Sequence, residues 1–233
     1  MSEDLLEVAA VEFGDLLGQV IFLGGATIGL WITDSAARAP RVTDDVDVIV
    51  EVTTLGAYEA FQEALRARGF REDQASGVIC RWRAGERGLT FDVIPAEPRL
   101  AGFGGAWLAR AAAAGVRRTL ASGIEIRAVP PAYLVATKLE AFWDRGDGDP
   151  LASKDFEDIT LLIDGRDELL GEIEDAEHDL RDFVSTGVAS LAHLPLFEYG
   201  LEGALLGVDA AARAAVVTIP RFAAIAALAH HPS

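Results

Sequence analysis

The feature that most limits how this chain can fold is a short apolar run that ends in two glycines. Residues 20–23 are Val-Ile-Phe-Leu, and Gly24 and Gly25 follow directly. Four consecutive apolar residues are typical of a strand buried on both faces, and a glycine pair permits a tight turn from a strand into a helix. We therefore expect a strand at 20–23 and a helix near 26–33. Such a turn presents backbone N–H groups that suit a phosphate, although many glycine pairs only permit the turn.

A second apolar strand is expected at 46–52. Two acids separated by one residue, Asp45 and Asp47, lie at its beginning. Because alternate side chains of a strand share a face, these two carboxylates point the same way, while Val46 and Val48 point into the core. Two carboxylates on one face repel each other and are costly to bury. A divalent cation bound through their oxygens removes both problems, so the pattern predicts a metal site.

A third acid, Asp92, lies in the apolar segment 89–94, which we expect to form a hairpin with 78–83. Phe91 and Val93 share one face of that strand, and Asp92 lies on the other. If this strand is the neighbour of 46–52, Asp92 becomes a third metal ligand. An acid between two apolar residues is common by chance, so this pattern by itself does not specify a site.

The remaining pattern predicts two parts of different character. Helices are expected at 3–17, 55–68, 106–114 and 131–143, a further one begins at 154, and 124–127 is a short strand. From 166 onward only helices are expected. The fold class is therefore α/β (α+β): a small mixed sheet flanked by helices over residues 1–129, and a helical C-terminal portion over 130–233.

Composition limits the classes of partner. The formal net charge of −17 repels nucleic acid at long range. The stretch 66–127, however, holds eleven arginines against six acids, which suits a locally bound phosphate or an ordinary solvated surface. The single cysteine excludes a disulfide within the chain. The acidic N-terminus and the lack of an uninterrupted apolar run of about 18 residues predict a cytoplasmic protein without a membrane partner.

Two groups of motifs resemble a known family. Gly24-Gly25, followed by Arg-Val-Thr-Asp-Asp-Val-Asp at 41–47, resembles the GG…RxTxDxD signature of the DNA polymerase β-type nucleotidyltransferase superfamily, in particular its AbiEii-like branch with the MenT-like toxins. The segment 136–159, with Lys138, Arg145 and Lys-Asp-Phe-Glu-Asp-Ile at 154–159, is similar to that branch's AxKxxA…R…KDxxDL segment. The resemblance covers about residues 21–162. Lys138 and Lys154 are the only two lysines of the chain, beside 18 arginines.

The resemblance implies a set of site residues and cofactors. Mg²⁺ (or Mn²⁺) is expected on the carboxylates, with an NTP as co-substrate, and one aspartate of the helix beginning at 154 is expected to be functional. Asp155 is preferred, but Asp158 shares its helix face, and acids in a first helical turn also stabilise a helix without any other role. The expected set is Asp45, Asp47 and Asp92 as metal ligands, Lys138 and Asp155 as further catalytic residues, and Gly24, Gly25, Thr27, Arg41, Thr43 and Asp158 as nucleotide-binding residues.

The expected function is metal-dependent transfer of an NMP from an NTP to a cellular acceptor. The resemblance allows tRNA as the acceptor, with the chain as the toxin of a toxin–antitoxin pair and a cognate antitoxin as a partner. A small-molecule acceptor of the aminoglycoside type is an alternative, and so is a non-catalytic nucleotide-binding module on the same scaffold. Glycosyltransferases also use an Asp-x-Asp metal site, but they do not call for a glycine pair about 20 residues upstream.

Overall fold

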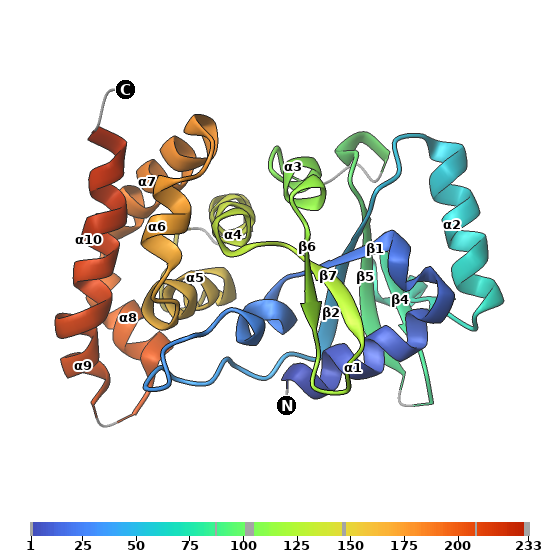
Figure 1. Cartoon of the computed structure of the whole chain (residues 1–233), viewed down its shortest axis with the longest axis horizontal. Coiled ribbons are helices and arrows are strands. Elements are labelled where there is room, and N and C mark those ends of the chain that lie inside the picture. Colours follow the sequence, from blue (N-terminus) through green and yellow to red (C-terminus); the bar gives the residue numbers. More distant parts are fainter. Residues whose placement is uncertain (1, 87, 101–104, 146–147, 208, 231–233) are drawn as a thin grey trace. The chain divides into compact units, whose positions relative to one another are not determined.

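The chain forms two compact units of different composition. The computed structural model describes residues 2–86, 88–100, 105–145, 148–207 and 209–230. The first unit comprises 1–30 and 41–130, and the second comprises 31–40 and 131–233. The first unit combines strands and helices, whereas the described part of the second consists of helices and loops (Figure 1). The predicted fold class, a sheet flanked by helices with a helical C-terminal portion, is confirmed.

A mixed sheet forms the first unit (Figure 1). Within the described residues it has seven strands in the order β3-β4-β5-β2-β1-β7-β6. β2 is central, antiparallel to β1 and parallel to β5, so the two acid-bearing strands are neighbours, which the sequence had left open. The strands are β1 (Val20–Leu23), β2 (Asp45–Val50), β3 (Arg71–Glu72), β4 (Arg81–Ala84), β5 (Leu89–Pro95), β6 (Val116–Thr119) and β7 (Glu125–Ala128).

Helices of the first unit include several 3₁₀ segments. The expected helix at 3–17 ends earlier, because Gly14 has a φ of +51° and the chain continues as a 3₁₀ helix. The expected helix near 26–33 is instead a six-residue 3₁₀ helix. The described elements are α1 (Ser2–Phe13), η1 (Gly14–Gln19), η2 (Gly25–Leu30), α2 (Leu55–Ala67), η3 (Gln74–Ser76), η4 (Pro98–Leu100) and α3 (Leu108–Ala113).

An aromatic cluster packs on one face of this sheet. The ring of Phe13, from α1, lies 5.3 Å from that of Phe70 and 5.4 Å from that of Phe91, measured between centroids. Phe22 of β1 joins the cluster with an edge-to-face contact to Phe13 at 6.1 Å. All four side chains are buried. Because neighbouring residues of a strand face opposite sides, burial of Phe91 turns Asp92 to the other face of the sheet.

The second unit is a set of short helices (Figure 1). Ser153 accepts a hydrogen bond from the Phe156 N–H at 3.2 Å and caps α5, as its sequence predicts. The elements are α4 (Pro131–Arg145), α5 (Lys154–Gly165), α6 (Leu169–Glu174), α7 (His178–Ala192), α8 (Phe197–Leu205), α9 (Ala210–Arg213), the π-helical η5 (Ala214–Thr218), α10 (Ile219–Ala227) and η6 (Leu228–His230).

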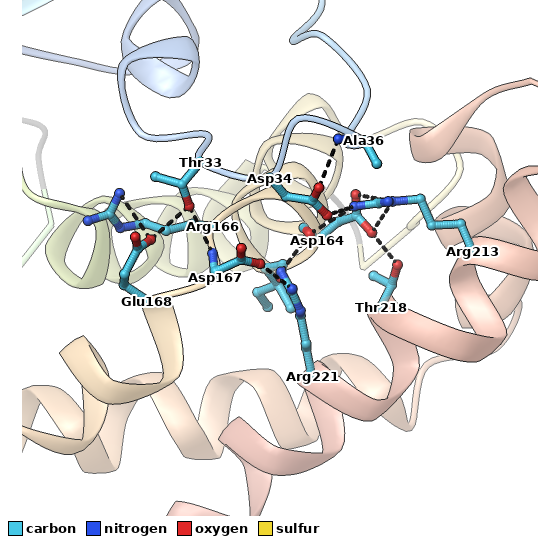
Figure 2. Close-up of polar contacts among 11 residues, drawn as sticks. Thr33, Asp34, Ala36, Asp164, Arg166, Asp167, Glu168, Arg213, Thr218 and Arg221 are labelled. Atoms are coloured by element: carbon cyan, nitrogen blue, oxygen red, sulfur yellow. Dashed lines mark hydrogen bonds and ion pairs between the residues drawn. The ribbon is translucent and has the colours of Figure 1, made fainter.

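A buried carboxylate, Asp164, is the centre of a polar network in this unit (Figure 2). Its side chain has no exposed surface. Arg213 Nε donates to both of its oxygens, at 2.9 and 2.7 Å, and Thr218 Oγ1 donates to Oδ1 at 2.7 Å. Arg213 also donates to Asp34 at 2.7 Å, and Arg221 donates to the main-chain oxygen of Asp164 at 2.7 Å. The network fastens the segment 31–40 to the helices of the same unit.

The π-helical segment η5 makes this network possible. Arg213 and Thr218 are five residues apart, and in an ordinary α-helix such positions are rotated by about 140° from one another. A π-helix closes its hydrogen bonds between residues five apart, so these positions lie near one another. Both side chains therefore reach the same carboxylate.

One described helix, 210–227, is long and apolar enough to cross a membrane by length and composition. Only 22% of that window is buried, and such a helix taken singly is weak evidence for a span. Two of its residues are arginines, Arg213 and Arg221, which form ion pairs with Asp164 and Asp167 of the same unit.

Candidate functional site

Three carboxylates lie on one face of two adjacent strands in the first unit. We call Asp45 and Asp47 of β2 and Asp92 of β5 the acidic face. Val46 and Val48, between and after the β2 acids, have no exposed surface, whereas Asp45 and Asp47 are half-buried. The alternation predicted for this strand is therefore confirmed, and both β2 carboxylates point away from the core.

Strand register places Asp47 directly beside Asp92. The two residues are Cα partners in the parallel β2–β5 pair, and Asp45 pairs with Thr90. Neighbouring strands lie about 4.8 Å apart, and side chains at paired positions share a face. The structure thus brings Asp47 and Asp92 together across the strands, while Asp45 lies two residues before Asp47 on β2.

A cation already contacts Asp92. Arg81 of β4 is the cross-strand partner of Asp92. Its Nε donates to Asp92 Oδ1 at 2.8 Å and its Nη2 donates to Oδ2 at 2.7 Å, a bidentate pair. The Asp92 side chain is 12% exposed and that of Arg81 is 25% exposed. These hydrogen bonds raise the pKa of Arg81, so the guanidinium stays charged.

Asp45 is held on its two oxygens by different groups. The Thr43 hydroxyl donates to Asp45 Oδ1 at 2.6 Å. Arg81 Nη2 lies 3.9 Å from Asp45 Oδ2, so its charge reaches two members of the acidic face. The predicted contact residue Thr43 therefore orients a carboxylate in this structure.

The backbone conformation and the surroundings of Gly24 require a glycine at this position. It has a φ of +77°, in the left-handed region that favours glycine. A Cβ added there would lie 1.9 Å from Oδ2 and 2.8 Å from Cγ of Asp47. Leu23 is the cross-strand partner of Asp47, so Gly24 follows β1 at the level of that carboxylate. The glycine leaves the space that the Asp47 side chain fills.

The other predicted nucleotide contacts of the first unit lie in the turn and the loop. Thr27 is fully buried, and both its hydroxyl and its N–H bond to the Gly24 oxygen, at 2.9 and 3.1 Å. Gly25 begins the 3₁₀ helix η2 and is buried. Arg41 is half-buried. In this structure Thr27 stabilises the turn, and a phosphate-binding role for Gly24, Gly25 and Arg41 stays a prediction.

Cys80, beside Arg81, does not supply a thiolate. Its side chain is buried, and burial, with the charges of Asp92 and Asp47 as smaller causes, raises the pKa of its thiol to about 12. A thiol with that pKa is protonated at neutral pH, and the thiolate is the form that binds a metal or attacks a substrate. The chemistry of this face is therefore carboxylate and guanidinium chemistry.

The predicted residues of the second unit form an ion cluster. Lys138 Nζ of α4 lies 3.0 Å from Asp155 Oδ1 and 2.7 Å from Asp158 Oδ2, both on α5. Arg145 adds a contact to Asp155 Oδ2 at 3.2 Å. Asp158 is 1% exposed and Asp155 is 13% exposed. The two aspartates share a face, as their spacing predicts, and both bind the same ammonium, so the choice between them remains open.

Lys154 has a different environment from Lys138. It is the first residue of α5 and is exposed. Together with Ser153 and Glu157 it lines a hollow of about 150 Å³ whose other wall is formed by Gly200 and neighbouring small residues of α8. The two lysines of the chain therefore divide into one buried in an ion cluster and one at the surface.

The donor set of the acidic face fits a divalent cation in part. Asp45 and Asp47 offer carboxylate oxygens on a partly exposed face, which suits a hard cation. Both oxygens of Asp92, in contrast, already accept hydrogen bonds from Arg81. Within the part of the chain that the structure describes, no three His, Cys, Asp or Glu side chains form a group that could hold a metal ion. The three-ligand site stays a prediction.

Sequence reasoning did not single out Arg81. The predicted strands 78–83 and 89–94, paired across a turn at 84–88, place Cys80 opposite Asp92. In the structure Ala84 belongs to the strand and pairs with Leu89, which places Arg81 opposite Asp92. Opposite charges at facing positions of an antiparallel pair attract each other. The register, which fixes that pairing, was the missing information.

Comparison with known proteins adds no relative. A scan against protein-family models and a search of curated proteins each found no match to this chain.

Proposed function

We propose that the chain is a divalent-metal-dependent nucleotidyltransferase that transfers an NMP from an NTP to a cellular acceptor. The observation that supports it most is the geometry around Asp47. This carboxylate fills the space left by Gly24, shares its face with Asp45 and is the strand partner of Asp92. The glycine pair and the Asp-x-Asp motif, about 20 residues apart in the sequence, thus meet at one place.

The roles proposed for the residues follow from their charges. Asp45 and Asp47 would hold Mg²⁺ or Mn²⁺, which supplies charge neutralisation at the triphosphate and so favours attack at the α-phosphorus. Thr43 holds the Asp45 carboxylate in place by its 2.6 Å hydrogen bond. Lys138, which the resemblance assigns to the triphosphate, is kept in place by two carboxylates.

The acceptor is proposed from the charge distribution and the resemblance. Arginines concentrated between residues 66 and 127 favour a phosphate-rich acceptor such as tRNA. The net charge of −17 favours a cationic small molecule of the aminoglycoside type. We prefer tRNA, with the chain acting as a toxin, because the resemblance is to the branch that contains the MenT-like toxins.

The experiment is label transfer from each of the four α-labelled NTPs to total tRNA. The Asp45→Asn/Asp47→Asn double variant is expected to abolish transfer, because the amides carry no negative charge to neutralise a hard cation and bind it much more weakly than carboxylates do. Asp44→Asn is the matched control, since Asp44 is exposed and precedes β2. Transfer that is undiminished in the double variant, with circular dichroism unchanged, would reject the proposal.

A second candidate, a nucleotide-binding module without catalysis, is favoured by one observation. Arg81 occupies both oxygens of Asp92, so the third expected ligand is engaged elsewhere. Equilibrium dialysis with labelled NTP separates the two candidates: metal-dependent binding without transfer to tRNA or to aminoglycosides favours the module.

A further inference from the structure

A positively charged residue, Arg81, lies in the row of strand partners that crosses the sheet at Asp47. Reading across adjacent strands, Arg81 of β4 pairs with Asp92 of β5, and Asp92 pairs with Asp47 of β2. The guanidinium makes two hydrogen bonds to Asp92 and lies 3.9 Å from Asp45 Oδ2. One cation therefore serves two carboxylates of the acidic face.

This placement differs from that of an ordinary surface ion pair. Asp92 is 12% exposed and its partner guanidinium 25% exposed, so solvent screens the pair less than it would on an open surface. The matched fork of arginine and carboxylate also fixes the direction of both groups. The pair is thus a built element of the acidic face.

A guanidinium bound in this way competes with a metal ion for Asp92. Hard cations bind through the same carboxylate oxygens, and two positive charges on one carboxylate repel each other. Asp45 does not have this restriction to the same degree, because only the Nη2 atom of Arg81 approaches it, at 3.9 Å. Arg81 therefore competes with a metal ion at Asp92 more directly than it does at Asp45.

We propose that the acidic face binds one divalent cation, on Asp45 and Asp47, and that Arg81 takes the place of a second cation on Asp92. Asp92 is then a positioning residue that holds Arg81, and it is not a metal ligand. This inference rests on the proposed function, since it takes the metal site on β2 as given. It changes the role that the sequence assigned to Asp92.

The test is a Mn²⁺ titration of the full chain without nucleotide, in which free Mn²⁺ is followed by electron paramagnetic resonance. The wild type is expected to bind one Mn²⁺ per chain, and Asp45→Asn or Asp47→Asn to weaken binding by about tenfold or more. Asp92→Asn is expected to leave both the stoichiometry and the affinity within about threefold of the wild type. Its amide oxygen still accepts from Arg81, so this variant retains part of the pair.

Arg81→Ala provides the complementary measurement. Removal of the guanidinium frees Asp92, so Mn²⁺ is expected to bind about tenfold more tightly or at a second site. Arg83→Ala is the matched control, because Arg83 lies on the same strand but pairs with Asp73 at 2.8 Å. That variant is expected to bind Mn²⁺ like the wild type. If Arg81→Ala does not fold, Asp92→Asn decides the question.

The outcomes separate this inference from the proposed function. A loss of about tenfold or more in Mn²⁺ affinity for Asp92→Asn overturns the inference and leaves the metal-dependent function standing, with Asp92 as a third ligand. Absence of Mn²⁺ binding in the wild type overturns the metal-dependent function. That result overturns the inference as well, because the inference takes a cation on Asp45 and Asp47 of the wild type as given.

Discussion

Removal of Arg213 should destabilise the second unit strongly, because it leaves a carboxylate without its cation in the interior. Asp164 has no exposed side-chain surface, and Arg213 donates to both of its oxygens (Figure 2). Breaking a buried ion pair by removing one partner costs about 3–5 kcal/mol. The lost contact to Asp34, a side chain that is 21% exposed, adds up to about 1 kcal/mol.

The expected total for Arg213→Ala is thus about 3–6 kcal/mol, a large part of the stability of a typical domain. Thr218→Val removes one hydrogen bond to the same carboxylate and is expected to cost about 1.5–3 kcal/mol. Asp164→Asn placed in the Arg213→Ala background should recover part of the loss, because it removes the buried charge. Arg181→Ala is the control, since the guanidinium of Arg181 donates only a 3.4 Å hydrogen bond to a main-chain oxygen among its described contacts.

Hydrogen exchange suits this measurement because the chain has two units and a single global transition is not assured. Amides of α5 (Lys154–Gly165) report on the second unit, and amides of β5 report on the first. A local loss of about 4 kcal/mol accelerates exchange in α5 by about a thousandfold. Acceleration of less than about tenfold in α5 would refute the reasoning, because Asp164 would then not depend on Arg213.

Two further predictions concern the glycine turn and the acid response. Gly24→Ala should displace the Asp47 carboxylate, because the new Cβ would lie 1.9 Å from its Oδ2, and should lower Mn²⁺ affinity; Gly18→Ala, whose Cβ meets nothing within 4 Å, should not. Equal Mn²⁺ binding by both variants would contradict this. The hydrogen bond from Arg213 lowers the pKa of Asp34 below its usual 3.8, so its contribution to stability is present above about pH 4 and is lost as the pH falls through the lowered value. Asp34→Asn should therefore be less stable than the wild type at pH 7 in urea unfolding, with the difference shrinking as the pH falls below about 4. A difference that stays constant as the pH is lowered would exclude Asp34 as a cause.

The sequence alone predicted those features that depend on local periodicity. The buried run 20–23, the alternation of acids and valines in 45–48, the helix from Leu55 and the cap at Ser153 all appear in the structure. Each of them depends only on residues that are close together in the sequence. The strands 71–72 and 116–119 were not predicted, because short exposed strands carry no apolar alternation and are defined only by their partners.

For the candidate site residues, the sequence indicated which chemical groups are present. The tertiary structure decided which of those groups contact one another. It indicated that Asp45 and Asp47 share a face, since that follows from the pleat of a single strand. It did not show that Gly24 leaves the space for Asp47, that Arg81 holds both oxygens of Asp92, or that Lys138 binds Asp155 and Asp158 together.

The physical reason for this division is the range over which each rule acts. Side-chain direction within a strand or helix is fixed by backbone geometry, which a sequence pattern reveals directly. Strand register, the π-helical turn that brings Arg213 and Thr218 to Asp164, and the attachment of 31–40 to the helical unit depend on residues far apart in the chain. Those contacts are selected by the packing of the whole unit, so only the folded structure decides them.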